Sequence, residues 1–242
     1  MDNHLMRGMI MRRSHGIAVA FAATLVVSAT AFAQDTPKPV AGGGISAPGW
    51  QGKIDASEAA KGAKLEDSKL VTMGPGLHVT TGPQVAYWNP ANTASGNYTV
   101  KATFSEREFM GLNDHPHPYG IFIAGNDMGT DNQTYLYCAA YGAGNFIVRG
   151  FGPAPFRMNG REGEMNAAVH KAEAKGKPVT QEIALKVSAD KVECIINGTT
   201  VASYPKTDLV GAGKLKSTDG IWGIRFGHNT DAHVAGLAMT KN

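Results

Sequence analysis

Apolar and polar residues alternate along much of the chain after residue 76. In the stretch YTVKATF (98–104) every second residue is apolar, and threonine and lysine fill the positions between. A period of two predicts a β-strand with one buried face. Short apolar runs follow at YGIFIAG (119–125), TYLYCAAYG (134–142), NFIVRGF (145–151), GIWGIRFGH (220–228) and HVAGLAMTK (233–241). Turn residues separate these runs, so the pattern predicts many short strands.

The clearest stretch is TQEIALKVSADKVECIINGTTVASYP (180–205), which predicts three strands joined by two turns. The first turn is Ser188-Ala189-Asp190 and the second is Asn197-Gly198. Asn-Gly between alternating runs is a strong hairpin signal, because both turn positions need a positive φ.

These elements predict an all-β fold of about eleven strands. The favoured architecture is a two-sheet antiparallel sandwich, or jelly roll, and an up-and-down barrel is the alternative. Residues 57–70 carry the one short helical pattern, which Gly62 weakens. The irregular segment 150–178 is expected to run over the face or rim of one sheet, which fits a sandwich better.

The first 33 residues have the composition of an export signal. Three arginines precede the uncharged run GIAVAFAATLVVSATAFA, which ends in Ala31-Phe32-Ala33. The run is shorter than the ~20 residues that span a bilayer, so cleavage is expected, with no membrane span remaining. Residues 34–49 are rich in Pro and Gly and predict a flexible leader. Residues 50–242 would then form one domain, in the periplasm or outside the cell.

Removing residues 1–33 lowers the formal charge from +3 to +1, because three arginines and one aspartate leave with them. A nearly neutral chain has no basic stripe for a run of phosphates, so nucleic acid is a poor candidate partner. Cys138 and Cys194 are the two cysteines. Each lies in an apolar run, which suits a buried thiol as well as a disulfide, and the sequence leaves both readings open.

The order of the runs is similar to that of the concanavalin A-like lectin/glucanase jelly roll. The likeness covers roughly residues 70–240 and depends on KVECIINGTTV (191–201) followed by GIWGIRF (220–226). It is closest to exported bacterial domains that resemble laminin G domains or 3-keto-disaccharide hydrolases. The resemblance implies two curved sheets, with a concave face on which glycans are often bound or cut.

The catalytic motif of the glucanases is missing at the expected places. A two-carboxylate mechanism needs a facing pair of acids. None of YLYCAAYG, NFIVRGF or GIWGIRFGH contains Asp or Glu. The sequence therefore favours binding over catalysis.

A set of tyrosines and arginines is the main candidate ligand site. If Leu136, Cys138, Phe146, Val148, Ile224 and Phe226 pack in the core, alternation sends Tyr135, Tyr137, Arg149 and Arg225 to the opposite face. That face is either a ligand site or an outer sheet surface covered by segment 150–178. Tyrosine rings stack on sugars and arginine forks bind carboxylates. His117 and Tyr119 are expected at the rim of this groove.

Two segments are candidate metal sites. In DHPHPY (114–119) the prolines favour extended backbone, so His115 and His117 point the same way and could bind zinc, with His228 as a third ligand. In the alternation of this run, however, His228 falls on the same side as Ile224 and Phe226, which are assigned to the core. The loop GNDMGTDNQT (125–134) offers Asp127 and Asp131 to calcium, although ordinary turn chemistry explains them equally well.

Three functions follow as hypotheses. The leading one is an exported protein that binds a carbohydrate or another cell-envelope polymer. The second is an enzyme of the 3-keto-glycoside hydrolase or lyase type that uses His115 or His117, with metal assistance. The third is a structural, self-associating envelope protein. No cofactor is firmly indicated, and the oligomeric state is open.

Overall fold

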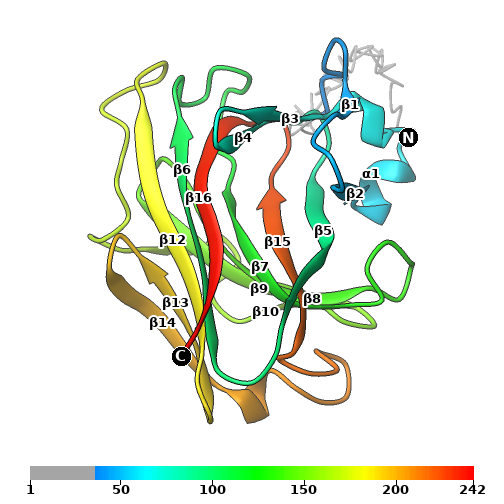
Figure 1. Cartoon of the computed structure of the whole chain (residues 1–242). Coiled ribbons are helices and arrows are strands. Elements are labelled where there is room, and N and C mark those ends of the chain that lie inside the picture. The colour runs from blue at the N-terminus through cyan, green and yellow to red at the C-terminus, as the bar shows by residue number, and fades with distance from the viewer. Residues whose placement is uncertain (1–35) are drawn as a thin grey trace, which may run out of the picture. The chain divides into compact units, whose positions relative to one another are not determined.

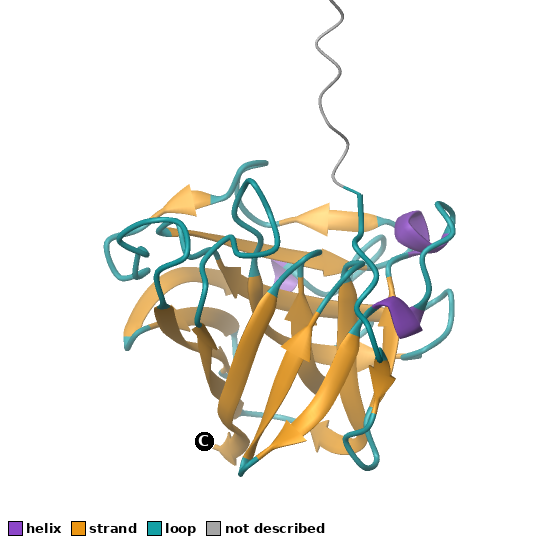
Figure 2. Cartoon of the chain, turned by 90° about the horizontal axis from the view of Figure 1, so that it is seen from above, coloured by secondary structure: helices purple, strands orange, loops and turns teal. Residues whose placement is uncertain are grey.

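The computed structural model describes residues 36–242, which form one compact unit of two β-sheets. Figures 1 and 2 show the sheets packed face to face, with loops joining them at both ends. The predicted signal peptide lies outside the described residues. The all-β sandwich is confirmed, and the barrel alternative is wrong because the strands form two separate sheets.

Sheet A has eight strands and sheet B has eight. In spatial order, sheet A contains β1 (Gly44–Ile45), β3 (Lys69–Met73), β4 (Gly76–Thr80), β16 (Asp231–Lys241), β6 (Tyr98–Glu106), β12 (Val179–Val187), β13 (Lys191–Ile196) and β14 (Thr199–Pro205). Sheet B contains β10 (Pro155–Arg157), β9 (Asn145–Phe151), β8 (Thr134–Ala140), β7 (Tyr119–Asn126), β15 (Gly220–Phe226), β5 (Val85–Ala94) and β2 (Gln51–Ile54), and β11 (Glu164–Met165) pairs with β9. Within these sheets only the β1–β3 pair is parallel.

The predicted hairpins are confirmed. β12 pairs with β13, and β13 with β14, through the two turns expected. Asn197 has φ 48° and Gly198 has φ 80°, which is the positive-φ geometry that Asn-Gly supplies. Along β6, buried and more exposed residues alternate, as the period of two predicted.

The core lies between the two sheets. Leu136, Cys138, Val148, Ile224 and Phe226, the residues that alternation assigned to it, are all buried there. Cys138 on β8 forms a disulfide with Cys194 on β13, which joins sheet B to sheet A through the core. The structure thus resolves the question that the sequence left open.

The helical pattern is shorter than expected. Only Ala56–Ala59 form an α-helix, α1, and Leu65–Asp67 form a 3-10 turn, η1. A second 3-10 turn, η2, spans Lys206–Asp208. No helix among residues 36–242 is long and apolar enough to cross a membrane.

The segment before Trp50 behaves differently from its prediction. Residues 36–49 were expected to be a flexible leader, but β1 pairs with β3 and the amide of Val40 donates to the carbonyl of Asp67. Because these backbone groups find partners on the domain, the segment lies against it despite its Pro/Gly-rich composition.

Segment 150–178 lies along the edge of sheet B, which is the rim and not the face among the two positions that the sequence allowed. β10 and β11 both pair with β9, and Val169 enters the core. The side-chain amide of Gln181 on β12 donates to the backbone carbonyl of His170. The segment therefore bridges the two sheets along one side of the sandwich.

Candidate functional site

The four predicted side chains gather on the outer face of sheet B. Tyr135 and Tyr137 come from β8, Arg149 from β9 and Arg225 from β15. Tyr137 and Arg149 are direct register partners. The guanidinium carbon of Arg225 lies 5.6 Å from the ring centroid of Tyr137. Alternation therefore predicted the correct face.

That face is more deeply covered than the sequence suggested. It carries a second apolar cluster, here called the outer cluster, made of Ala86, Trp88, Phe122, Tyr135, Tyr137, Ala139 and Ile147. Tyr135 is fully buried in it, with its ring centroid 4.9 Å from that of Phe151 and 5.0 Å from that of Phe122. Burial also raises the pKa of Tyr135 well above its usual value. Tyr135 packs the face and is not on a reachable surface, which corrects the prediction.

Arg225 is buried too, and it is paired. Its Nη2 lies 2.6 Å from Oδ2 of Asp55 and donates to Oε1 of Gln84 at 3.2 Å. Burial alone would lower the pKa of Arg225, but the Asp55 carboxylate raises it above its ordinary value. The guanidinium therefore stays charged as half of an internal ion pair. The guanidinium holds Asp55 and packs over the rings of Tyr137 and Phe151.

A pocket of about 550 Å³ opens beside this ion pair. We call it the arginine pocket, and its walls include Asp55, Gln84, Tyr137, Arg149, Phe151 and Arg157. Because Arg225 neutralises Asp55, the lining keeps two further positive charges, from Arg149 and Arg157. These two arginines face each other across the β9–β10 pair.

Arg149 is only partly satisfied by the protein. Its Nη2 donates to the carbonyl of Arg161. Its Nε is buried without a hydrogen-bond partner among residues 36–242. A buried N–H left without a partner costs about 1–3 kcal/mol, so an acceptor placed here would be favourable.

The two predicted rim residues do not line the arginine pocket. Tyr119 is fully buried in the core between the sheets, with its ring 5.5 Å from that of Phe104 and 6.2 Å from that of Phe226. As the first residue of β7 it shares the inward parity of Ile121, so its rim placement was wrong. His117 is half-buried and outside the pocket lining.

The three histidines do come together. The ring centroid of His117 lies 4.6 Å from that of His115 and 4.4 Å from that of His228. Even so, no group of three His, Cys, Asp or Glu side chains in the described part of the chain could hold a metal ion. A role for His115 and His117 in metal binding or in catalysis stays a prediction.

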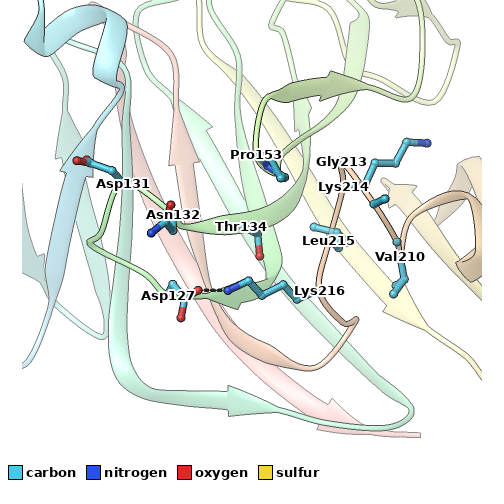
Figure 3. Close-up of a pocket in the computed structure, with 12 residues that line it drawn as sticks. Asp127, Asp131, Asn132, Thr134, Pro153, Val210, Gly213, Lys214, Leu215 and Lys216 are labelled. Atoms are coloured by element: carbon cyan, nitrogen blue, oxygen red, sulfur yellow. Dashed lines mark hydrogen bonds and ion pairs between the residues drawn. The ribbon is translucent and has the colours of Figure 1, made fainter.

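In the acidic loop, both candidate carboxylates have lysine partners. Asp127 pairs with Lys216, and Asp131 pairs with Lys53 at 2.9 Å. Lys53 also holds the pKa of Asp131 below its usual value. Figure 3 shows Asp127 and Lys216 joined at the edge of a second pocket of about 700 Å³, between this loop and residues 210–216. The calcium hypothesis for Asp127 and Asp131 stays a prediction, and an ion there would have to replace the two lysines as partners of the carboxylates.

No protein-family model and no curated protein sequence matches this chain. Solved structures do resemble it. Carbohydrate-binding module CBM66 from Bacillus subtilis aligns with TM-score 0.52 at 7% identity, over 82% of this chain and 99% of the module. A Bacillus subtilis protein of unknown function with a galectin-like fold aligns with TM-score 0.52 at 13% identity, over 79% of this chain and 89% of that one. The likeness concerns the fold alone: the chain shares the two-sheet β-sandwich architecture of these two proteins.

Proposed function

We propose that this chain is an exported protein that binds an acidic carbohydrate in the arginine pocket. One observation carries the proposal: Arg149 and Arg157 line a cavity whose one acidic lining residue, Asp55, is already neutralised. The pocket therefore has an excess of positive charge that no lining side chain among the described residues balances.

Arginine suits the carboxylate or sulfate of an acidic sugar. Its planar fork donates two parallel hydrogen bonds and stays charged at any physiological pH. Arg157 is exposed, and Arg149 has a buried Nε without a partner in the described chain. A ligand oxygen could satisfy that N–H, which favours an anionic group over a hydroxyl.

Aromatic side chains supply the other half of a sugar site. Phe151 is half-buried at the pocket wall, and Tyr137 lies 6.4 Å from it, with the two rings stacked. Apolar ring faces suit the CH groups of a pyranose. Burial raises the pKa of Tyr137, although Arg225 partly opposes this, so its hydroxyl stays protonated and can donate at neutral pH.

Fold and disulfide support the rest of the proposal. A carbohydrate-binding module is among the solved structures that share this fold, which makes glycan binding a natural use for it. The internal Cys138–Cys194 disulfide is typical of proteins that fold outside the reducing cytosol. This agrees with the export signal expected from residues 1–33.

The test is retention on an acidic polysaccharide, such as polygalacturonate, compared with an uncharged one, such as dextran. Arg149→Ala and Arg157→Ala should each weaken binding to the acidic polymer by about tenfold or more, the equivalent of ~1.4 kcal/mol. Retention should also fall as salt rises, because the contact is between charges.

Arg161→Ala is the matched control. The side chain of Arg161 is exposed, pairs with Glu162 and does not line the pocket. Its replacement removes the same charge but keeps the backbone carbonyl that accepts from Arg149. Equal retention of wild type and both pocket variants would contradict the site. Equal retention on both polymers would contradict the acidic ligand while leaving glycan binding open.

A further inference from the structure

A third pocket, distinct from the arginine pocket and from the pocket beside Asp127, lies between the two sheets. Sheet A lines it with residues of β3, β4 and β16, and sheet B lines it with residues of β5 and β15. We call it the tryptophan pocket because Trp50 and Trp222 both lie in its wall, with Asn89 and Asn92. It shares no lining residue with the arginine pocket.

A bulge in β5 creates the polar part of this pocket. In the β15–β5 pair, Ile221 faces Thr93 but Gly223 faces Trp88. Residues 89–92 therefore leave the ladder opposite the single residue Trp222. The side chain of Asn89 accepts a hydrogen bond from the amide of Ala91 at 3.0 Å, which closes the turn. The bulge thus places two asparagines in the lining of the same pocket as Trp222.

The chemistry of the lining is uncharged. No Asp, Glu, Lys or Arg is among the described residues that line the pocket. Trp222 is only 8% exposed, and its indole N–H has no hydrogen-bond partner among residues 36–242. Trp50, Asn89 and Asn92 are half-buried. The cavity therefore offers aromatic surface, amides that both donate and accept, and a donor that lacks an acceptor.

Its size matches a single small ring. The volume is about 310 Å³, near the lower end of the roughly 300–1,000 Å³ found for ligand pockets. An apolar ligand would leave the amides and the indole N–H unsatisfied, and an ion would find no opposite charge. A sugar ring has apolar CH faces and several hydroxyls, so it matches both parts of the lining.

We propose that the tryptophan pocket binds an uncharged sugar ring, stacked on Trp50 and hydrogen-bonded by Asn92 and the Trp222 N–H. This site is separate from the proposed acidic site, and neither depends on the other. The chain would then hold two sugars of different charge, one on the outer face of sheet B and one between the sheets.

The experiment titrates the wild-type protein with uncharged methyl glycosides of common hexoses and pentoses. The chain has three tryptophans, so its NMR spectrum contains three indole N–H signals. We expect at least one glycoside to shift the signals of Trp50 and Trp222 to saturation and to leave that of Trp88 unchanged. Trp50→Phe assigns the signals. The affinity should not change with salt, unlike that of the arginine pocket.

Two variants test the contacts. Asn92→Ala should weaken binding by about tenfold, and Trp50→Ala should abolish it. Asn132→Ala, in an exposed loop outside this pocket, and Arg149→Ala should both bind like wild type. If Trp50→Ala does not fold, Asn92→Ala decides. The proposal is overturned if no glycoside shifts the Trp50 and Trp222 signals, or if Asn92→Ala folds and binds unchanged.

Discussion

The two faces of sheet B are both apolar, but they are covered in different ways. On the inner face, Leu136, Val148 and Phe226 pack against a complete second sheet. On the outer face, Tyr135 is just as buried, but no second sheet of the described chain packs against it there. The outer cluster is covered in part by the Arg225–Asp55 ion pair, and the arginine pocket opens beside that pair. Burial of an aromatic residue therefore does not reveal whether it belongs to a core or to the floor of a site. The predictions below test this contrast.

The largest effect is expected from Asp55→Ala, which would leave the buried guanidinium of Arg225 without its partner. Breaking a buried pair in this way typically costs 3–5 kcal/mol, because an uncompensated charge stays inside. Chemical denaturation would measure the loss in the free energy of unfolding. Asp131→Ala is the control, since the carboxylate of Asp131 is fully exposed beside Lys53 and its loss should leave the free energy of unfolding nearly unchanged. Equal effects would mean that the outer cover does not depend on the Arg225 pair.

The next effect concerns the inner face. Replacing both Cys138 and Cys194 by alanine should lower the free energy of unfolding by about 2–4 kcal/mol, because the bridge restricts the unfolded chain. A reducing agent should lower the stability of the wild type similarly and leave the double variant unchanged. An unaltered wild type in reductant, with the bridge shown to be open, would contradict the expectation.

A third effect comes from an acid that sequence reasoning overlooked. Glu106, the last residue of β6, is buried, and its Oε1 accepts a hydrogen bond from the backbone amide of Met110 at 3.1 Å. Its Oε2 has no hydrogen-bond partner within residues 36–242. Burial raises the pKa of Glu106 from 4.5 to about 7, and the negative charge of Asp231 adds to the increase.

The raised pKa gives a sign for the pH dependence. The folded protein prefers the protonated acid, so this contribution is fully present below pH 4.5 and is lost as the pH rises through about 7. We expect stability to fall by roughly 1–3 kcal/mol between pH 5 and pH 8 from this group. Glu106→Gln should flatten that slope and should be more stable than wild type at pH 8. A variant with an unchanged slope would rule Glu106 out as the source.

The smallest effect is expected from Arg149→Ala. Arg149 is partly exposed at the pocket, so its removal should change the free energy of unfolding by less than about 1 kcal/mol while it weakens glycan binding. Thermal melting of the purified variant would check this. A loss in the free energy of unfolding as large as that of Asp55→Ala would show that Arg149, like Arg225, mainly stabilises the fold.

Much of the fold could be predicted from local patterns, because alternation and turn residues act over a few positions. The β12–β14 hairpins and the sorting of Leu136 and Cys138 from Tyr135 and Tyr137 follow from these signals. Tyr119 was misplaced although the parity of Ile121 could have placed it inside.

The cover of the outer face could not be predicted in this way. Asp55 and Arg225 are 170 positions apart, and nothing in the sequence links them. The tryptophan pocket depends on a bulge at residues 89–92, which breaks the period of two that the prediction relied on. Long-range pairs and irregular ladders decide the sites, whereas local signals decide the strands.

The outermost strands have a consequence for self-association. An open sheet edge exposes unpaired backbone groups that can recruit another chain and start aggregation. Here β1, β10 and β2 are two, three and four residues long, and Lys53 lies on β2. The longer β14 ends at Pro205 and pairs with β13 through a bulge. Because short, charged or irregular edge strands resist strand-to-strand growth, we expect the domain to remain dispersed at high concentration.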